Sequence, residues 1–429
     1  MHETLARLHS KGAAMRRVAV ILGFALLLPG ASPPFAQSPS PQSASPAPLT
    51  FQAALDLALQ NNAGLAAAKL AKAVREAAVI SAKQRPNPEF SFEITRDTPH
   101  ETVGLGLPFE LGGKRARRID LAREEQSLAD IEVRGALQSL RGELRRSFYG
   151  LLAAEERVRL ADEVAAIARR VREAAQARFD EGVAPRLDVL EAELGLARAA
   201  ADLELERSNR TAAAAALNAV LNRPPGQPIA VSGDLSSGPP PLTAERAWEM
   251  AAAANIEIVS LHREIAIEGR RSDLLRAERT PTPVLLGGAV LNAPGEFNSG
   301  AFAGLAVDIP LFSRNQGEIA QSTATTRQLE VRLEATIRSI ESFVFGSTAK
   351  LEALRGQVAS YARTLVPTAI AIESLAEESY KLGRAPLLSV LEAQRTLRDV
   401  RREYLQALAD FQSAIAELEE IIGEPIQDK

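Results

Sequence analysis

The sequence predicts a mainly α-helical protein with a small membrane β-barrel portion, built from one unit that occurs twice. Two corners of nearly the same sequence indicate the duplication: GVAPRLDVLEA begins at Gly182 and GRAPLLSVLEA begins at Gly383. The long stretches around each corner carry the alternating steps of three and four residues between apolar positions that are typical of coiled coils. Two pairs of short segments alternate apolar with small or polar residues, as the strands of membrane barrels do.

Composition excludes several classes of protein. The chain has 429 residues, no cysteine, four histidines and a formal net charge of −4. Without cysteine there can be no disulfide, thiolate metal site, cysteine nucleophile or lipid on an N-terminal cysteine. His2 and His9 lie in a segment that we expect to be removed, so no histidine cluster remains for a metal, and no serine–histidine–aspartate set can be read. We therefore expect no enzyme, no cofactor, no catalytic or metal-binding residue and, from the charge, no nucleic-acid partner.

The N-terminal segment reads as an export signal followed by a leader. Two arginines precede an apolar run from Val18 to Leu28, and small residues follow, so residues 1–36 are predicted to be a secretory signal peptide. Met15 is an alternative start to Met1. Residues 37–48 are rich in proline and serine and are expected to be an extended leader. No later apolar run reaches the length of about 20 residues that a transmembrane helix needs.

Matched segments divide the rest of the chain into two repeats. LTFQAALDLALQNN begins at Leu49 and LTAERAWEMAAAAN begins at Leu242, and further matches follow at a nearly constant offset. An offset of about 200 residues is far longer than solenoid repeats of about 20–50 residues. We predict a first repeat at 49–224, a linker at 225–241 and a second repeat at 242–425. Each repeat is expected to open with one uninterrupted helix, from Thr50 to about Lys83 and from Thr243 to about Glu278.

A pair of strands is expected next in each repeat, at about 89–109 and 283–311. In EFSFEITR, from Glu89, alternation places Phe90, Phe92 and Ile94 on one face and small or polar residues on the other. This is the pattern of a membrane barrel with a wet lumen, and a half-buried periplasmic sheet has the same period. Four strands cannot close a barrel, and an open edge in lipid leaves backbone groups unpaired, so several chains must pool their strands.

Long helical hairpins are expected at about 114–222 and 317–422. At each corner the glycine supplies the left-handed residue that ends the first helix, and the proline, Pro185 or Pro386, is tolerated in the first turn of the next. The chain thereby reverses into two antiparallel helices. The apolar positions expected to form packing seams are Leu160, Val164, Ile167 and Val171 before the first corner, Leu187, Leu190, Leu194, Ala197 and Ala201 after it, and Val400, Tyr404, Leu408, Phe411, Ile415 and Leu418 in the last helix.

The stretch LGGKRARR, from Leu111 to Arg118, follows a strand and opens a basic helix. Two glycines before a helix could cradle a phosphate, but the stretch lacks the P-loop spacing of Gly, four residues and Gly-Lys-Ser/Thr. A bend from strand to helix is the favoured interpretation.

The sequence around the two corners resembles the TolC-like outer-membrane efflux factors. Two stretches carry the resemblance: RFDEGVAPRLDVLEAELGLARAAADLELERSN from Arg178, and YKLGRAPLLSVLEAQRTLRDVRREYLQALADF from Tyr380. LPFELGGKRARRIDLAREE from Leu107, together with VDIPLFSRNQGEIAQSTA from Val307, is similar to the CzcC-like branch of the family, whose members serve heavy-metal efflux pumps.

The resemblance implies an architecture, a location and partners. Four strands from each of three chains would close a twelve-stranded barrel in the outer membrane, and twelve long helices would form a periplasmic tunnel. The homotrimer would be the outer-membrane channel of a tripartite efflux system. It would passively conduct heavy-metal cations received from a periplasmic adaptor and an inner-membrane proton-driven pump of the resistance-nodulation-division (RND) type.

The resemblance also assigns roles to residues at the corners. In the family, acidic rings just past the second corner narrow the tunnel mouth. The matching positions are Ser389 and Glu392, one of them a serine here, with Asp188 and Glu191 as their first-repeat equivalents. Alternatively, these acids only favour the start of a helix through its dipole. The residues expected to dock on the adaptor are Gly182, Val183, Pro185, Leu187, Gly383, Pro386 and Leu387.

Two other functions fit parts of the sequence. The channel could export drugs or small organic molecules, because the pump and not the channel chooses the substrate. A structural periplasmic coiled-coil protein would explain the apolar seams but not the alternating strand pairs.

Overall fold

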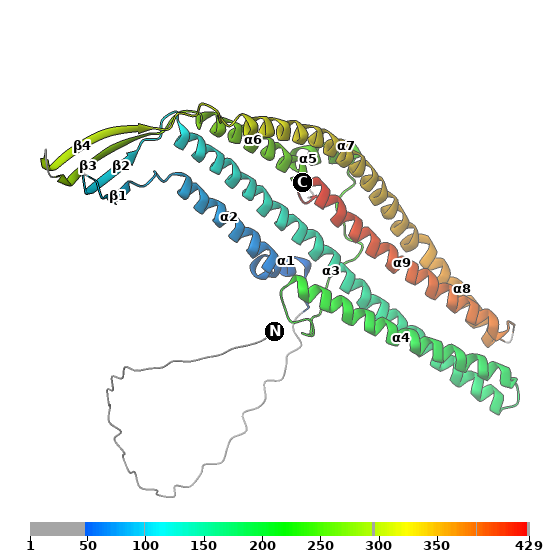
Figure 1. The fold of residues 1–429 in the computed structure, drawn as a ribbon. Coiled ribbons are helices and arrows are strands. Elements are labelled where there is room, and N and C mark those ends of the chain that lie inside the picture. Colours follow the sequence, from blue (N-terminus) through cyan, green and yellow to red (C-terminus); the bar gives the residue numbers. More distant parts are fainter. Residues whose placement is uncertain (1–47, 98, 294–296, 383, 427–429) are drawn as a thin grey trace, which may run out of the picture. The chain divides into compact units, whose positions relative to one another are not determined.

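The computed structural model describes residues 48–426 apart from 98, 294–296 and 383, and for 292, 293, 297, 298, 381 and 387 it describes the backbone alone. The predicted signal peptide and nearly all of the leader lie outside the described residues. Helices dominate the described part, and one antiparallel sheet accompanies them (Figure 1). The predicted fold class, mainly α with a small four-stranded sheet, is confirmed.

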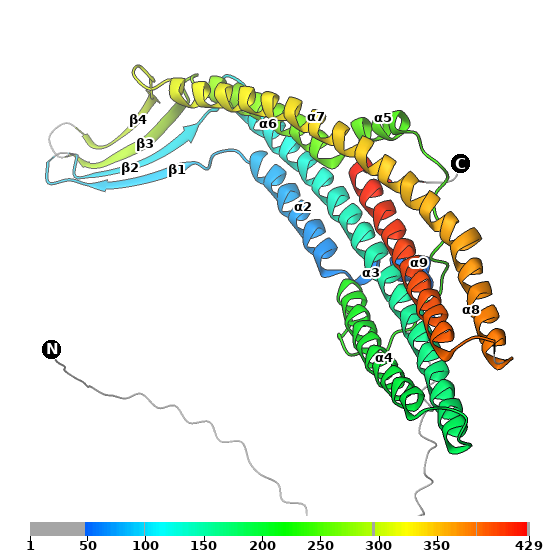
Figure 2. The same cartoon turned by 90° about the vertical axis from the view of Figure 1, so that its right-hand side faces the viewer.

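Neighbouring strands of the sheet are also neighbours in the chain (Figures 1 and 2). The central pairing, between β2 and β3, joins the strand pairs of the two repeats and sets Gly104 opposite Gly288. The outer strands β1 and β4 each leave one row of backbone groups unpaired within the described chain. The strands are β1 (Glu89–Ile94), β2 (Glu101–Pro108), β3 (Pro283–Ala293) and β4 (Phe297–Val307).

Each repeat opens with two helices, so the prediction of one uninterrupted helix is wrong. The breaks fall at Asn62 and Asn255, whose backbones are extended, with ψ of 122° and 126°. The side-chain oxygen of each asparagine accepts hydrogen bonds from N–H groups in the first turn of the following helix, which starts a new helix there. The four helices are α1 (Phe51–Asn61), α2 (Ala63–Ala82), α5 (Ala244–Ala254) and α6 (Ile256–Ala277).

Two antiparallel helical hairpins have their corners at the end away from the sheet (Figures 1 and 2). The first consists of α3 (Lys114–Asp180) and α4 (Arg186–Val220). The second runs through α7 (Gln316–Ser360), a π-helical turn (Tyr361–Leu365) and α8 (Val366–Lys381), and returns in α9 (Leu387–Ile422). The 67 residues of α3 span about 100 Å at 1.5 Å each.

The π-helical turn has a local cause. Pro367 has no N–H to donate to the carbonyl four residues earlier, so the regular helical bonding is already interrupted there. Val366 donates instead to the carbonyl of Tyr361, five residues earlier, which is the π-helical bond. The corresponding part of the first hairpin, in α3, is continuous α-helix.

The two repeats share one hydrophobic core, to which α3, α4, α7 and α9 all contribute. The predicted linker lies against this core, because the Gln412 amide donates to the carbonyls of Leu235 and Ser237 at 2.8 and 2.6 Å. Fully buried side chains of the core include Phe148, Leu151, Leu217, Leu221, Ile415 and Leu418.

A buried polar cluster is set into the same core. The Arg145 guanidinium lies 5.5 Å from the ring centre of Phe51 and 5.6 Å from that of Tyr149, and it pairs with the Glu419 carboxylate at 3.2 Å. Burial raises the pKa of Glu419 above its usual value, and the charge of Arg145 opposes this shift. The ion pair ties the last turns of α9 to the middle of α3.

The packing seam predicted for α4 is wrong. Leu187, Leu190 and Leu194 are 50–61% exposed. The buried side of α4 packs instead on an alanine-rich face of α3 that includes Ala165 and Ala175. Small side chains let two helices approach closely, so the alanines and not the leucines decide which faces meet. The buried α4 residues are Val189, Ala192, Ala199 and Leu203, whereas in α9 the predicted Leu408, Phe411, Ile415 and Leu418 are buried as expected.

Candidate functional site

The sheet presents one apolar face, made of the side chains that the alternation predicts. Phe90, Ile94 and Leu305 are 65–72% exposed on this face. Residues directly opposite each other on paired strands point to the same side, so the pairs Phe90–Leu105 and Leu285–Leu305 keep the apolar residues together. An apolar face without cover in the described chain indicates contact with lipid or with other chains.

The opposite face of the sheet is polar on β1 and crowded on β3. Glu89, Ser91 and Glu93 point to this side, by alternation with Phe90. The ring of Phe302 lies over Gly288, where an added Cβ would also come within 2.1 Å of the Val103 carbonyl oxygen. A glycine is therefore required at position 288, because the neighbouring strand leaves no room for a side chain.

The first corner contains the left-handed glycine that the sequence predicts. Gly182 has a φ of +75°, and the N–H of Val183 donates to the carbonyl of Arg178 at 2.9 Å, which closes the end of α3. Pro185 then caps α4 with extended backbone. The side chains of Val183 and Leu187 are exposed at this corner.

The second corner repeats this backbone path in the residues that are described. Arg384 donates its N–H to the carbonyl of Ser379 at 2.8 Å, and Pro386 caps α9 with a φ of −70° and a ψ of 159°. Gly383 lies outside the described residues, and only the backbone of Leu387 is described.

A contact between the two hairpins is not predicted from the sequence. Arg178, in the last turn of α3, donates a hydrogen bond to the hydroxyl of Tyr380, near the end of α8. The guanidinium also lies 4.9 Å from the centre of the tyrosine ring. The two residues occupy nearly equivalent places before Gly182 and Gly383, and that equivalence is the sequence signal that could have suggested the pair. This contact joins the hairpins next to their corners.

A groove of about 560 Å³ lies between the hairpins, lined by α3, α4, α8 and α9. Of the predicted mouth residues, Glu191 lines this groove. Glu392 is exposed on α9, while Asp188 and Ser389 are half-buried. Neither α4 nor α9 has a side-chain hydrogen bond at its cap, so Asp188 and Ser389 do not cap their helices.

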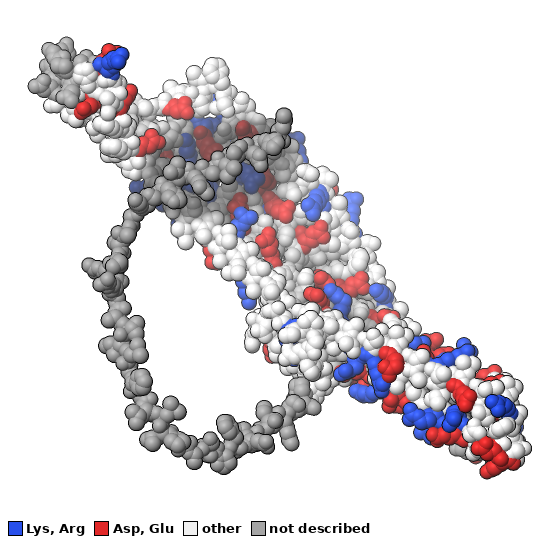
Figure 3. All heavy atoms as spheres, turned by 60° about the horizontal axis from the view of Figure 1, so that its bottom comes forward, with Lys and Arg blue, Asp and Glu red and all other residues white. Residues whose placement is uncertain are grey.

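Charged side chains of both signs cover the hairpins on the face drawn in Figure 3. Some join the two repeats, such as Arg401 with Glu163 at 3.0 Å and Arg402 with Glu206 at 3.7 Å. Within the described residues no group of histidine, aspartate and glutamate side chains is arranged to hold a metal ion. No helix in the described ranges combines the length and the apolar character needed to span a membrane.

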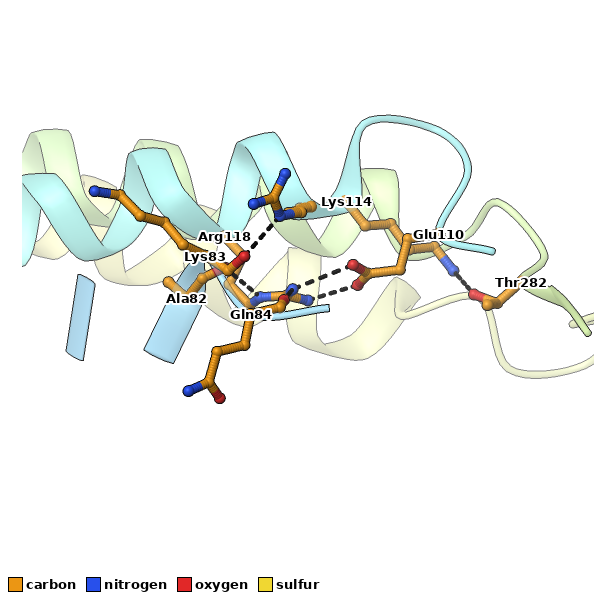
Figure 4. Close-up of polar contacts among 8 residues, drawn as sticks. Ala82, Lys83, Gln84, Glu110, Lys114, Arg118 and Thr282 are labelled. Carbon is orange, nitrogen blue, oxygen red and sulfur yellow. Dashed lines mark hydrogen bonds and ion pairs between the residues drawn. The ribbon is translucent and has the colours of Figure 1, made fainter. Parts of the chain in front are cut away.

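The stretch LGGKRARR forms the bend between β2 and α3 (Figure 4). Gly112 and Gly113 have φ of +71° and +73°, which turns the chain into the helix. Arg118 pairs with Glu110 at 2.6 Å and donates to the carbonyls of Ala82 and Gln84 at the end of α2. Its donors thus satisfy carbonyls that a helix end leaves unpaired, which is a structural use of the basic side chain.

The sequence matches one protein family over most of its length. A family model described as "Outer membrane efflux protein" matches residues 54–223 and 289–424. The chain belongs to this family. The matched segments include both helical hairpins, and the predicted resemblance to TolC-like efflux factors is confirmed.

Individual members of the outer membrane efflux protein family are similar over most of their length. The cobalt-zinc-cadmium resistance protein CzcC of Cupriavidus metallidurans is 30% identical, over 95% of this chain and all of that protein, which supports the CzcC-like branch. The outer membrane efflux protein BepC of Brucella suis is 26% identical, over 84% of this chain and 82% of its own.

Solved structures share the fold at lower identity. A structure of CusC has a TM-score of 0.73 at 16% identity and covers 87% of this chain and 92% of its own. The open state of the MtrE outer membrane channel of Neisseria gonorrhoeae has a TM-score of 0.72 at 18% identity, over 88% of this chain and 89% of that one.

Proposed function

We propose that this protein is the outer-membrane channel of a tripartite efflux system in a Gram-negative bacterium. In this proposal a homotrimer passively conducts heavy-metal cations to the exterior. The cations reach it from an inner-membrane RND pump through a periplasmic adaptor.

One observation carries the proposal: the sheet has four strands, an exposed apolar face and two open edges. In lipid, an edge that is not paired leaves N–H and carbonyl groups without partners, which costs several kcal/mol for each group. Pairing β1 of one chain with β4 of the next removes every edge when the ring closes. Three chains give twelve strands, which is within the range of bacterial barrels.

Exposed apolar residues on the helices also favour association between chains. Leu70 and Val74 on α2 are exposed, and so is Leu375 on α8. Because α2 and α7 are the outer helices of the row α2–α3–α6–α7, and α8 continues α7, such residues are available to a neighbouring chain.

The metal substrate is supported by the similarity to CzcC, whose name gives resistance to cobalt, zinc and cadmium. We propose the corners as the adaptor-docking tips, because Val183 and Leu187 are exposed apolar residues there. Glu392 is our candidate for the tunnel mouth, because its side chain is exposed close to the second corner.

The proposal is tested by deleting the gene and by cross-linking the protein in membranes. The deletion strain should become sensitive to cobalt, zinc or cadmium, and the largest cross-linked species in the outer-membrane fraction should be a trimer. Sensitivity to organic drugs but not to metals would indicate that the channel exports drugs or small organic molecules instead of metal cations. A monomer found in the soluble periplasm would overturn the channel and favour a structural coiled-coil protein.

A further inference from the structure

At the end of β2 the usual distribution of charged and apolar side chains is inverted. Glu110 lies between Phe109 and Leu111, yet the Glu110 side chain is only 12% exposed while its two neighbours are 51% and 50% exposed. Figure 4 shows the reason: the Glu110 carboxylate points toward Arg118 and forms a bidentate ion pair with its guanidinium. In water the charged side chain would be the one expected outside. The inversion indicates that the surroundings of this bend are apolar.

The second repeat places apolar residues at the equivalent bend, after β4. Ile309 and Leu311 are more than half exposed, and Phe312 is 92% exposed. The two bends lie at the same end of the antiparallel sheet, since β2 and β4 both run toward the helices (Figure 2). The exposed apolar residues Phe109, Leu111, Ile309, Leu311 and Phe312 are here called the junction residues.

Basic side chains accompany the junction residues on their helical side. Arg115 donates through Nε to the carbonyl of Lys83 at 2.8 Å, and Arg279 does the same to the carbonyl of Arg314 at 2.8 Å. Arg314 in turn donates through Nε to the carbonyl of Pro310 at 3.2 Å. These bonds hold the three arginines in place and use only one nitrogen of each guanidinium.

None of the described carboxylates forms an ion pair with Lys83, Arg115, Arg279 or Arg314, although most basic groups elsewhere on the helices have such a partner. Two acids of this region are engaged otherwise: Glu110 pairs with Arg118, and Glu278 accepts from the Asn315 amide at 3.4 Å. A third, Asp308, is exposed next to Ile309 and forms no ion pair with these four basic groups. The junction therefore combines exposed apolar groups with positive charge that the described chain does not neutralise.

We propose that the junction binds anionic phospholipids of the periplasmic leaflet of the outer membrane. The junction residues insert at the boundary of the acyl chains, and Lys83, Arg115, Arg279 and Arg314 contact the headgroup phosphates. An amphipathic surface of this composition matches a membrane interface, where apolar groups enter the lipid and cations attract anionic headgroups. The inference rests on the proposed outer-membrane location and adds the class of lipid.

Quenching by brominated lipids tests the site directly. The chain has a single tryptophan, Trp248, on α5, which is separated from the junction by the 22 residues of α6, about 33 Å. In Phe312→Trp the introduced indole should be quenched by vesicles of dibrominated phosphatidylcholine, whereas the wild-type fluorescence should hardly change. In a second comparison only a minor component of each vesicle is brominated. At the same fraction, brominated phosphatidylglycerol should quench the indole fluorescence roughly twofold more than brominated phosphatidylcholine.

The matched variants separate lipid contact from lipid preference. Adding Arg279→Gln and Arg314→Gln to Phe312→Trp should make the two brominated lipids equally effective as quenchers. The control adds Arg159→Gln and Arg246→Gln, which lie on exposed helical surface, to Phe312→Trp. It should keep the stronger quenching by phosphatidylglycerol. Equal quenching by both lipids with all arginines present would overturn the anionic preference. No quenching, in vesicles where the same protein conducts ions, would overturn the junction site while the channel function stands.

Discussion

Asn62 and Asn255, at equivalent places in the two repeats, make the same two contacts. Each side-chain oxygen accepts from the first turn of the following helix. Each side-chain nitrogen donates to a carbonyl near the end of a returning hairpin helix, from Asn62 to Val220 at 3.0 Å and from Asn255 to Ile421 at 2.7 Å. One amide thus joins the start of one helix to the end of another, and satisfies groups that both helix ends would leave unpaired.

Asn255→Ala should therefore destabilise the protein by about 1–3 kcal/mol, because it removes a cap and leaves a carbonyl without its partner. Asn62→Ala should cost less, because Asn62 is half-buried whereas Asn255 is only 7% exposed. Thermal unfolding of the detergent-solubilised protein measures both effects. Gln321→Ala, on an exposed face of α7, is the control and should change stability by less than about 0.5 kcal/mol. Similar melting temperatures for all three variants would contradict the role of the asparagines.

Gly182→Val should strain the first corner without a steric clash. The φ of +75° disfavours a side chain by roughly 1–2 kcal/mol, yet no atom lies within 4 Å of the position where Cβ would be. We expect normal amounts of trimer, weaker cross-linking to the adaptor and reduced metal resistance. Gly195→Ala, in the regular part of α4 with equally open surroundings, should keep resistance. Loss of the trimer itself in Gly182→Val would indicate that the corner is needed for folding and not for docking.

Features with a local cause could be predicted from the sequence. Alternation identifies the apolar face of the sheet, and a glycine followed by proline identifies the corners, because each depends on a few adjacent residues. The break at Asn62 could not be read from apolar spacing, since the spacing continues across it. The side-chain oxygen of Asn62 nevertheless caps the start of α2, so a new helix begins there.

Features that depend on two distant segments could not be predicted. Hydrophobicity favours Leu187 and Leu190 as the seam of α4, but the close approach of α3 selects alanine. The contact of Arg178 with Tyr380 needs the two hairpins to be side by side, which no single stretch specifies. The same holds for the pair of Arg145 with Glu419, which are 274 residues apart in the sequence.

Glu419 should make the stability of the protein depend on pH. Burial raises the pKa of this carboxyl above its usual value of 4.5, so the folded state takes up a proton more readily than the unfolded state. Stability should then fall as pH rises from about 4.5 through the raised value, and stay lower above it. Glu419→Gln retains an acceptor for Arg145 without titrating, so its melting temperature relative to wild type should be more favourable at pH 7 than at pH 4.

The matched control for this pH effect is the adjacent Glu420, which is more exposed and pairs with Arg146 at 3.1 Å. Glu420→Gln removes a neighbouring carboxylate that is not buried. If Glu419→Gln behaved in the same way as Glu420→Gln, burial of Glu419 would not be the source of the pH dependence.

Glu392→Gln should alter ion selectivity without altering stability. In the proposed trimer, three copies of this exposed carboxylate surround the narrow opening, where like charges attract cations and concentrate them. Glutamine keeps the size of the side chain and removes the charge, so in planar bilayers we expect a weaker preference for cations and less block by divalent ions added from the periplasmic side.

Glu191→Gln is the comparison variant: its side chain lines the groove between the hairpins, so its effect on selectivity should be smaller. If Glu392 only favoured the start of α9 through the helix dipole, its loss would cost about 0.3–1 kcal/mol and selectivity would stay as in wild type. Equal selectivity in Glu392→Gln and wild type would thus remove Glu392 from the tunnel mouth and leave the channel itself unaffected.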